Sequence, residues 1–139
     1  MVDTSVARRR YTARVSDAHL DVTIDQKRKL VVATRGGFEV ARAADITAMI
    51  AYAREAVGEL QRSAYGMLVD LRKAPLSVES RFAGPLTALR QELTREFRRA
   101  AFLVETKMGL LQVQRFVREE RLNAQVFDDY ARALAHLAS

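Results

Sequence analysis

The sequence contains no cysteine, and this absence excludes several kinds of function at once. A chain without thiols cannot form a disulfide scaffold, use a thiol nucleophile or bind a metal ion through thiolates. Such a chain suits a reducing compartment, so we expect a cytoplasmic protein. Long apolar runs are also missing. None approaches the roughly 20 residues that span a membrane, and no signal-peptide core follows Met1. We therefore expect no transmembrane segment.

Histidine is scarce, and the motifs of common cofactor sites are absent. The two histidines, His19 and His136, lie near opposite ends of the chain, and neither has a partner at the spacing of metal ligands. Because a zinc site needs several protein ligands, we expect no metal ion. The sequence also has no P-loop, no dinucleotide-binding glycine motif and no Gly-x-Ser-x-Gly elbow. We therefore expect no cofactor.

Positive charge is in excess, with a formal net charge of +6 at pH 7 and a pI near 10.2. Four of the 23 basic residues are lysines and the others are arginines. They are dense only at residues 8–10 and 95–99, and elsewhere acids are interspersed with them, as in residues 118–121. Such mixed charges cancel part of each other's field. Aromatic residues make up only 7% of the chain, which leaves little for stacking on bases. Nucleic acid therefore stands third among the expected partners.

The length of 139 residues suits one domain. Residues 1–13 are polar, basic and aperiodic, and we expect a flexible tail there, followed by a single α/β domain over residues 14–139. Leu20, Val22 and Ile24 alternate with polar residues, which predicts a strand with one buried face. Residues 30–34 predict a second strand, and the two together read as a β-hairpin.

The remaining chain alternates helical and extended patterns. A short apolar run at residues 67–71, bounded by Gly66 and Pro75, predicts a central parallel strand buried on both faces. Similar runs at residues 100–104 and 124–127 predict two further strands. Apolar residues at helical spacing predict four helices, over residues 45–62, 82–97, 110–121 and 128–137. The second helix either starts near Gly84 or is kinked there, because Pro85 is tolerated in a first turn. The expected apolar face of the third helix is Leu110, Val113, Phe116 and Val117, and that of the fourth is Tyr130, Ala131, Leu134 and Leu137. The expected order is β-β-α-β-α-β-α-β-α, with a four- or five-stranded, mostly parallel sheet whose crossovers are right-handed.

Six short segments are distinctive in their order and spacing, namely residues 30–32, 36–38, 68–72, 100–104, 114–116 and 126–134. Together with the order of the elements, they resemble the STAS superfamily, the domains similar to anti-sigma-factor antagonists. The resemblance extends over residues 20–137 and is greatest to the stand-alone bacterial SpoIIAA-like branch, which is often grouped with CRAL-TRIO-like lipid carriers. It implies a right-handed βα superhelix with strands in sequential order.

The resemblance implies several roles rather than one activity. Members of the superfamily serve as regulatory binding partners, as modules of transporters, or as proteins with suspected lipid binding. Regulatory members carry a phosphorylated serine in an Asp-Ser-Ser-Gly motif after the central strand. Here residues 75–81 read Pro-Leu-Ser-Val-Glu-Ser-Arg, so the motif is absent. Ser77 and Ser80 are better explained as helix-capping residues, and we expect no phosphorylation site.

Asp70 and Arg72 are the best candidates for a ligand-binding site. They follow the predicted central strand at its carboxyl end, where open α/β sheets bind ligands. A salt bridge between the two, or a carboxylate that accepts a backbone N–H, explains them better than ligand binding does. Another acidic pair, Asp128 and Asp129, lies where the last helix begins, and we expect it to cap that helix.

Two main functions fit these observations. The first is a non-enzymatic binding or regulatory domain. Both faces of the predicted sheet carry apolar residues, so a second subunit in a homo-oligomer such as a dimer, or a lipid or other apolar small molecule, could shield a face that the helices leave open. A protein partner is a further candidate. The alternative is a small enzyme that uses Asp70 and Arg72, and nucleic-acid binding through the basic surface comes third.

Overall fold

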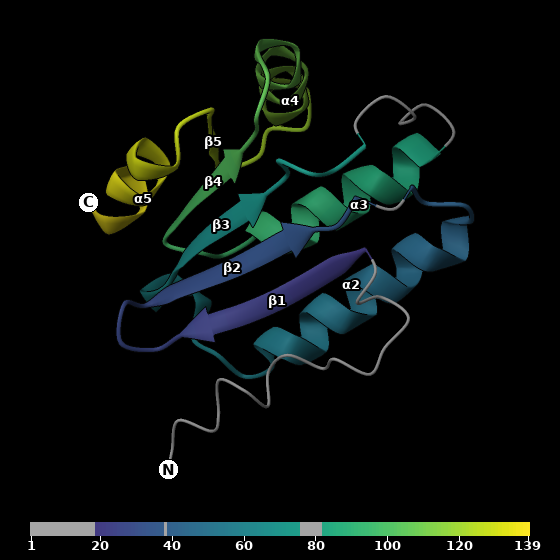
Figure 1. Cartoon of the computed structure of the whole chain (residues 1–139). Coiled ribbons are helices and arrows are strands. Elements are labelled where there is room, and N and C mark those ends of the chain that lie inside the picture. The colour runs from purple at the N-terminus through teal and green to yellow at the C-terminus, as the bar shows by residue number, and fades with distance from the viewer. Residues whose placement is uncertain (1–18, 38, 76–81) are drawn as a thin grey trace.

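In the part of the chain that the structure describes, five strands form one sheet, and they lie side by side in their order along the chain (Figure 1). The first strand is antiparallel to the second, and the other neighbouring pairs are parallel. This confirms the predicted mostly parallel sheet with the 67–71 run at its centre. The strands are β1 (Leu20–Asp25), β2 (Leu30–Arg35), β3 (Gly66–Asp70), β4 (Arg99–Leu103) and β5 (Gln125–Phe127).

The structure is a computed structural model that describes residues 19–37, 39–75 and 82–139. The expected basic tail, residues 1–13, and the two serines, Ser77 and Ser80, lie outside these described residues. The helices of the described part are α2 (Ala43–Val57), α3 (Ala83–Thr94), α4 (Lys107–Glu119) and α5 (Tyr130–Ala138), with a short 3-10 helix η2 (Arg62–Ala64).

The predicted helix of residues 45–62 ends earlier than its apolar spacing suggests. α2 stops at Val57 because Gly58 takes a φ of 58°, a left-handed conformation that breaks the helix. Leu60, which continues the helical spacing, therefore belongs to the connection before η2. The other predicted elements are confirmed to within a few residues, and Pro85 is accommodated in the first turn of α3.

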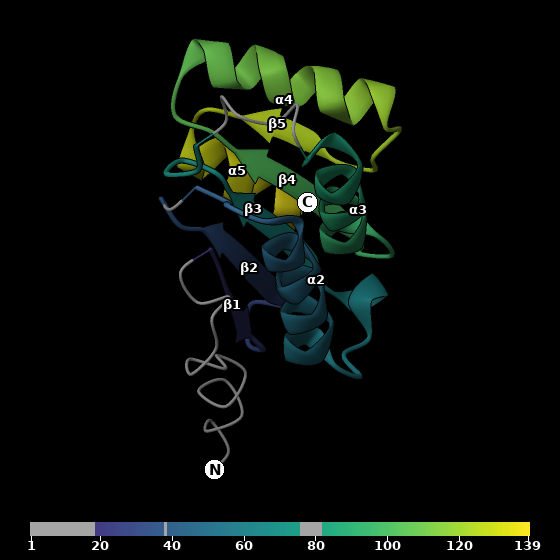
Figure 2. The same ribbon diagram turned by 90° about the vertical axis from the view of Figure 1, so that its right-hand side faces the viewer.

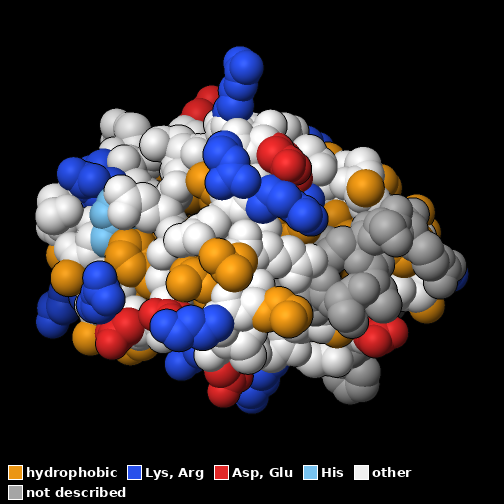
Figure 3. Space-filling model, turned by 90° about the horizontal axis from the view of Figure 1, so that it is seen from above, with side chains coloured by type: hydrophobic (Ala, Val, Ile, Leu, Met, Phe, Trp, Pro, Cys, Tyr) orange, Lys and Arg blue, Asp and Glu red, His pale blue; other side chains and the backbone are white. Residues whose placement is uncertain are grey.

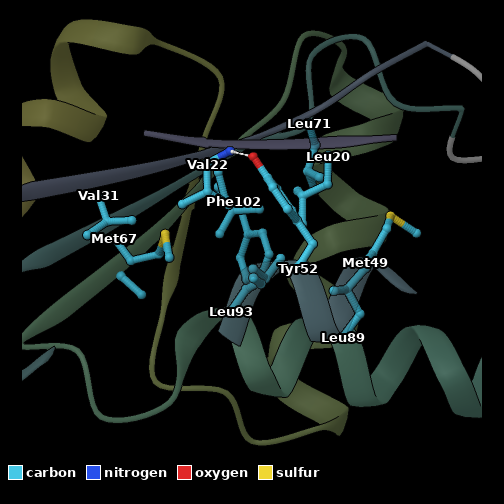
Figure 4. Close-up of a cluster of buried hydrophobic side chains, with 14 of the residues drawn as sticks. Leu20, Val22, Val31, Met49, Tyr52, Met67, Leu71, Leu89, Leu93 and Phe102 are labelled. Carbon is cyan, nitrogen blue, oxygen red and sulfur yellow. Dashed lines mark hydrogen bonds between the residues drawn. The ribbon is translucent and has the colours of Figure 1, made fainter. Parts of the chain in front are cut away.

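The helices lie on both sides of the sheet (Figure 2). α2 and α3 cover one face, here called the front face, while α5 covers the opposite or back face. α4 packs against β5 at the edge of the sheet. The front-face core is the larger, and burial of its apolar area is the main source of stability (Figure 4). It includes Leu20, Val22, Val31, Met67, Val69 and Phe102 from the strands with Met49, Tyr52, Leu89 and Leu93 from the helices.

The back face is covered by the chain itself over its central strands. Ala133 and Leu137 of α5 pack on apolar residues of β2, β3 and β4. Gly66 permits this contact, since a Cβ atom there would lie only 3.3 Å from the Leu137 Cβ atom. The predicted apolar face of the last helix is partly wrong, because Tyr130 and Ala131 are exposed and Ala133 is buried in their place.

The open edge of β1 is bonded by a side chain of α2, the helix that covers the front face of the sheet. The side chains of β1 on the back face are polar. The Tyr52 hydroxyl of α2 accepts a hydrogen bond from the backbone N–H of Val22, at 3.0 Å (Figure 4). It also donates to a carboxylate oxygen of Asp21, at 3.3 Å. An edge strand with paired backbone groups is a poor template for another chain. The α2 helix therefore shields both the core and one edge of the sheet.

A buried carboxylate ties the front-face helices together. The Glu92 side chain of α3 is only 4% exposed and makes salt bridges with three arginines. Arg54 comes from α2, Arg62 from η2 and Arg95 from the turn after α3, and their nitrogens lie 3.1, 2.9 and 3.1 Å from the Glu92 oxygens. The Glu92 charge is thus compensated on several sides, as a buried charge requires.

We predict that Glu92→Gln destabilises the protein by about 3 kcal/mol, because it removes the charge that three arginines surround. Burial alone would raise the pKa of Glu92, but hydrogen bonds from Arg95, Arg62 and Arg54 outweigh it and hold the pKa below its ordinary value of 4.5. A carboxyl with a lowered folded-state pKa stabilises above its unfolded-state pKa and loses that contribution as the pH falls.

Urea unfolding at several pH values tests this prediction. Wild-type stability should fall more steeply below pH 4.5 than that of Glu92→Gln. Glu96→Gln is the matched control, since the Glu96 side chain is 67% exposed and its salt bridge with Arg95 lies at the surface. Equal losses in the two variants would show that the Glu92 cluster does not hold the helices together.

Candidate functional site

Asp70 and Arg72 lie together at the carboxyl end of β3, as the sequence predicts, and they bind each other. The Arg72 Nε and Nη2 atoms donate to the two Asp70 carboxylate oxygens at 3.1 and 2.9 Å. The Arg72 backbone N–H also donates to Asp70, at 3.0 Å. Both explanations that the sequence leaves open beside ligand binding, a salt bridge and an N–H acceptor, are therefore observed.

This pairing fixes the charge of both groups. Burial alone would raise the pKa of Asp70, but the Arg72 side-chain and backbone hydrogen bonds and the Arg72 charge together lower the pKa. The hydrogen bond to Asp70 likewise raises the pKa of Arg72. A carboxylate with a lowered pKa is a weak general base at neutral pH, because it has little tendency to take up a proton. The pair is thus better suited to holding the strand end than to acid–base chemistry.

A cleft of about 310 Å³ opens beside this pair, at the ends of β3 and β4 and the start of α4. Arg72 lines it, whereas Asp70 is not among the lining residues. Thr106, one of the lining residues, is the N-cap of α4, and its hydroxyl accepts a hydrogen bond from the Gly109 N–H at 2.9 Å. The lining residues are Leu71, Arg72, Ala74, Glu105, Thr106, Met108, Gly109 and Gln112.

One exposed hydrophobic side chain, Met108, lines the cleft, and two others lie near residues of its lining. In the described part of the chain, the large hydrophobic residues that face solvent are Met108, 79% exposed, Leu111, 67%, and Tyr130, 46%. Met108 lines the cleft, Leu111 follows it by three positions on α4, and the Tyr130 ring centroid lies 5.5 Å from the Arg72 guanidinium carbon. Figure 3 shows the molecule from above, on the side where α4 lies, with hydrophobic side chains between charged ones. The cleft with Met108, Leu111 and Tyr130 is called the carboxyl-end surface below.

The α4 helix is fixed through its inner face and through polar contacts with α3. Only Gly109 and Val113 of this helix are buried. Arg90 of α3 lies over the Phe116 ring, 4.0 Å from its centroid, and its Nη2 atom is 2.6 Å from a carboxylate oxygen of Glu120, just after α4. The Arg90 and Glu120 side chains are each 12% exposed, so this contact is largely shielded from water.

The predicted inner face of α4 is correct, but the exposed hydrophobic residues on its outer face are not predicted. The predicted apolar positions Leu110, Val113, Phe116 and Val117 face inward or are partly buried. Met108 and Leu111 fall outside that face in the helical repeat. This spacing is the feature of the sequence that indicates their exposure. Tyr130 was assigned to a buried face and is exposed instead. The predicted cap at the last helix is confirmed, since Asp129 accepts from the Arg132 N–H at 3.0 Å.

Two further features bear on the kind of site. Within residues 19–37, 39–75 and 82–139, no cluster of three or more histidine or acidic side chains could hold a metal ion. No helix in the described part of the chain is long and apolar enough to cross a membrane.

No family model matches the sequence, and no curated protein matches it either. Among solved structures, an uncharacterised protein of the DUF3478 family from Shewanella loihica PV-4, described as having a SpoIIAA-like fold, is similar to this chain. The similarity covers 85% of this chain and 91% of that one, with a TM-score of 0.61 and 17% sequence identity. The chain has a SpoIIAA-like fold. The fold expected from the sequence resemblance is thereby confirmed, and at this identity the similarity speaks for the fold alone.

The contact between Arg90 and Glu120 positions the outer face of α4 in this SpoIIAA-like domain. We predict that Glu120→Gln accelerates hydrogen exchange of α4 amides roughly tenfold, because a charge-assisted hydrogen bond contributes about 1.5 kcal/mol. Amides of β3 and β4 should keep their exchange rates. Glu119→Gln, one position earlier and exposed, is the control and should leave α4 unchanged. Unaltered α4 exchange in Glu120→Gln would mean that packing alone holds the helix.

Proposed function

We propose that this protein is a non-enzymatic, regulatory binding domain that engages a protein partner through the carboxyl-end surface. The observation that carries the proposal is the exposure of Met108 in the cleft, with Leu111 three positions further on α4 and Tyr130 against the cleft-lining Arg72. Exposed apolar side chains that lie close together mark interaction surfaces. A location in a reducing cytoplasm, proposed from the absence of cysteine, is part of this proposal.

The contact between Asp70 and Arg72 favours binding over catalysis. A small enzyme that relied on them would need at least one of the two to act on a substrate. Asp70 instead holds Arg72 through both carboxylate oxygens and does not line the cleft. Arg72 does line it, and its guanidinium also faces Tyr130. We therefore assign Arg72 a role in shaping the binding surface, with Asp70 as the residue that positions it.

An apolar ligand and a second subunit are less well supported. Either would shield a sheet face that the helices leave open, but α5 covers the back face over β3 and β4. What remains there is a cleft of about 280 Å³ between α5 and the β1–β2 turn, lined by Leu30, Leu134, Leu137, Arg28, Lys29 and Ala138. A lipid would occupy this cleft, and native mass spectrometry of the purified protein would detect it. The homo-oligomer stays a prediction for sedimentation analysis.

Site-specific photo-crosslinking in the native cell tests the proposed surface. A photoreactive phenylalanine at position 111 should give a discrete adduct with another protein, because that position lies at the centre of the outer face of α4. The control is the same residue at position 51, which is exposed on α2, on the front-face side of the sheet. Adding Met108→Glu to the position-111 protein should reduce the adduct, since it places a charge where an apolar contact is expected.

Adducts of equal yield at positions 51 and 111, or none at 111, would contradict the proposal. An adduct of twice the mass of the chain would identify the partner as a second copy, and would replace the regulatory interpretation with a homo-oligomer.

A further inference from the structure

The outer face of α4 combines apolar and basic side chains in one stripe. Lys107, Met108, Leu111, Arg115 and Arg118 are all exposed, whereas Gly109 and Val113 on the opposite side are buried. At 3.6 residues per turn, the five exposed side chains fall within an arc of about 100°. The two most exposed hydrophobic side chains of the described residues thus lie between three cations.

Among the described residues, the cations of this stripe have no acidic partner in a salt bridge. In the described part of the chain, no carboxylate lies within salt-bridge distance of Lys107, Arg115 or Arg118. Glu120, which follows α4 directly, binds Arg90 of α3 instead. The exposed Glu119, next to Arg118, offsets part of this charge. Three cations against one acid still leave a net positive field around an apolar centre, and an interface forms most readily when the partner carries the opposite charge.

We infer that the partner at this surface is an acidic amphipathic segment of another protein, which packs apolar side chains on Met108 and Leu111 and places carboxylates opposite Lys107, Arg115 and Arg118. This inference rests on the proposed function and adds the chemistry of the partner to it. The apolar contact supplies most of the affinity, and the charges supply orientation and a faster encounter.

A nucleic acid fits this stripe less well than a protein segment does. Single-stranded nucleic acids bind through bases stacked on aromatic side chains, and the outer face of α4 presents none. A phosphate backbone would use the three cations but would gain nothing from Met108 and Leu111. The two exposed hydrophobic residues therefore favour a partner with apolar side chains of its own.

A set of synthetic peptides tests the inference by fluorescence anisotropy. The probe is a helical peptide of about five turns with leucines along one face and glutamates beside them. Its twins carry glutamine or lysine in place of glutamate. The glutamate peptide should bind roughly tenfold more tightly than the glutamine twin at low salt, and this preference should shrink at high salt because exposed charges are screened.

Variants of the protein separate the two contributions. Leu111→Ser should weaken the binding of the glutamate and glutamine peptides alike, by roughly tenfold or more, since it removes an interface anchor. Arg115→Glu combined with Arg118→Glu should reverse the preference, so that the lysine twin binds best. Arg28→Glu combined with Lys29→Glu makes the same change of charge at the β1–β2 turn, far from α4 (Figure 1), and should leave the preference unchanged.

Several results would overturn the inference. One is equal binding of the glutamate and glutamine peptides at low salt, and another is an unchanged preference in the Arg115→Glu, Arg118→Glu variant. If Leu111→Ser bound the glutamate peptide as the wild type does, and duplex DNA or anionic vesicles bound both equally, the stripe would be a simple polyanion site. If the peptides show no preference while the position-111 adduct persists, the partner chemistry is wrong and the proposed surface stands.

Discussion

The structure depends on one constraint, the need to cover both faces of the central strands. β3 and β4 are apolar on each side, with Met67, Val69 and Phe102 toward the front and Leu68 and Leu103 toward the back. α2 and α3 cover the front side, and α5 covers the back side because Gly66 lets it approach closely. With the centre covered, α4 is left at the β5 edge, where it buries little of its surface. Its exposed face is thus a consequence of how the core is completed.

The same arrangement favours binding over chemistry at the carboxyl ends of the strands. Asp70 and Arg72 are directed to each other, so the charge that could act on a substrate is already engaged. The exposed groups that α4 presents between Lys107 and Arg118 are mainly apolar or cationic, and this helix is held in place by the contact of Arg90 with Glu120. A rigid helix with an open apolar face is what a recognition surface needs, because little ordering is left to occur when a partner binds.

Much of the fold could be predicted from the sequence, because buried parallel strands leave short apolar runs and hairpin strands leave alternation. The location of Asp70 and Arg72 followed from the same reasoning, and their salt bridge was the favoured explanation, although two residues at a strand end can also point to a ligand. The end of α2 was missed because Leu60 continues the helical spacing beyond Gly58. The prediction that Tyr130 is buried was wrong. The phase of Met108 and Leu111 placed them outside the apolar face of α4, but their degree of exposure did not follow, because an amphipathic pattern does not say how much of a helix the core can cover.

The central claim is that α4 is held by one face and keeps the other free for a partner. Urea unfolding of the double variant Met108→Gln, Leu111→Gln tests it most directly, beside Val113→Gln on the same helix. Because Val113 is only 1% exposed, its substitution should cost about 3 kcal/mol. The double variant should remain within about 0.5 kcal/mol of the wild type. A loss in the double variant as large as that of Val113→Gln would show that Met108 and Leu111 serve the fold, and would contradict the account.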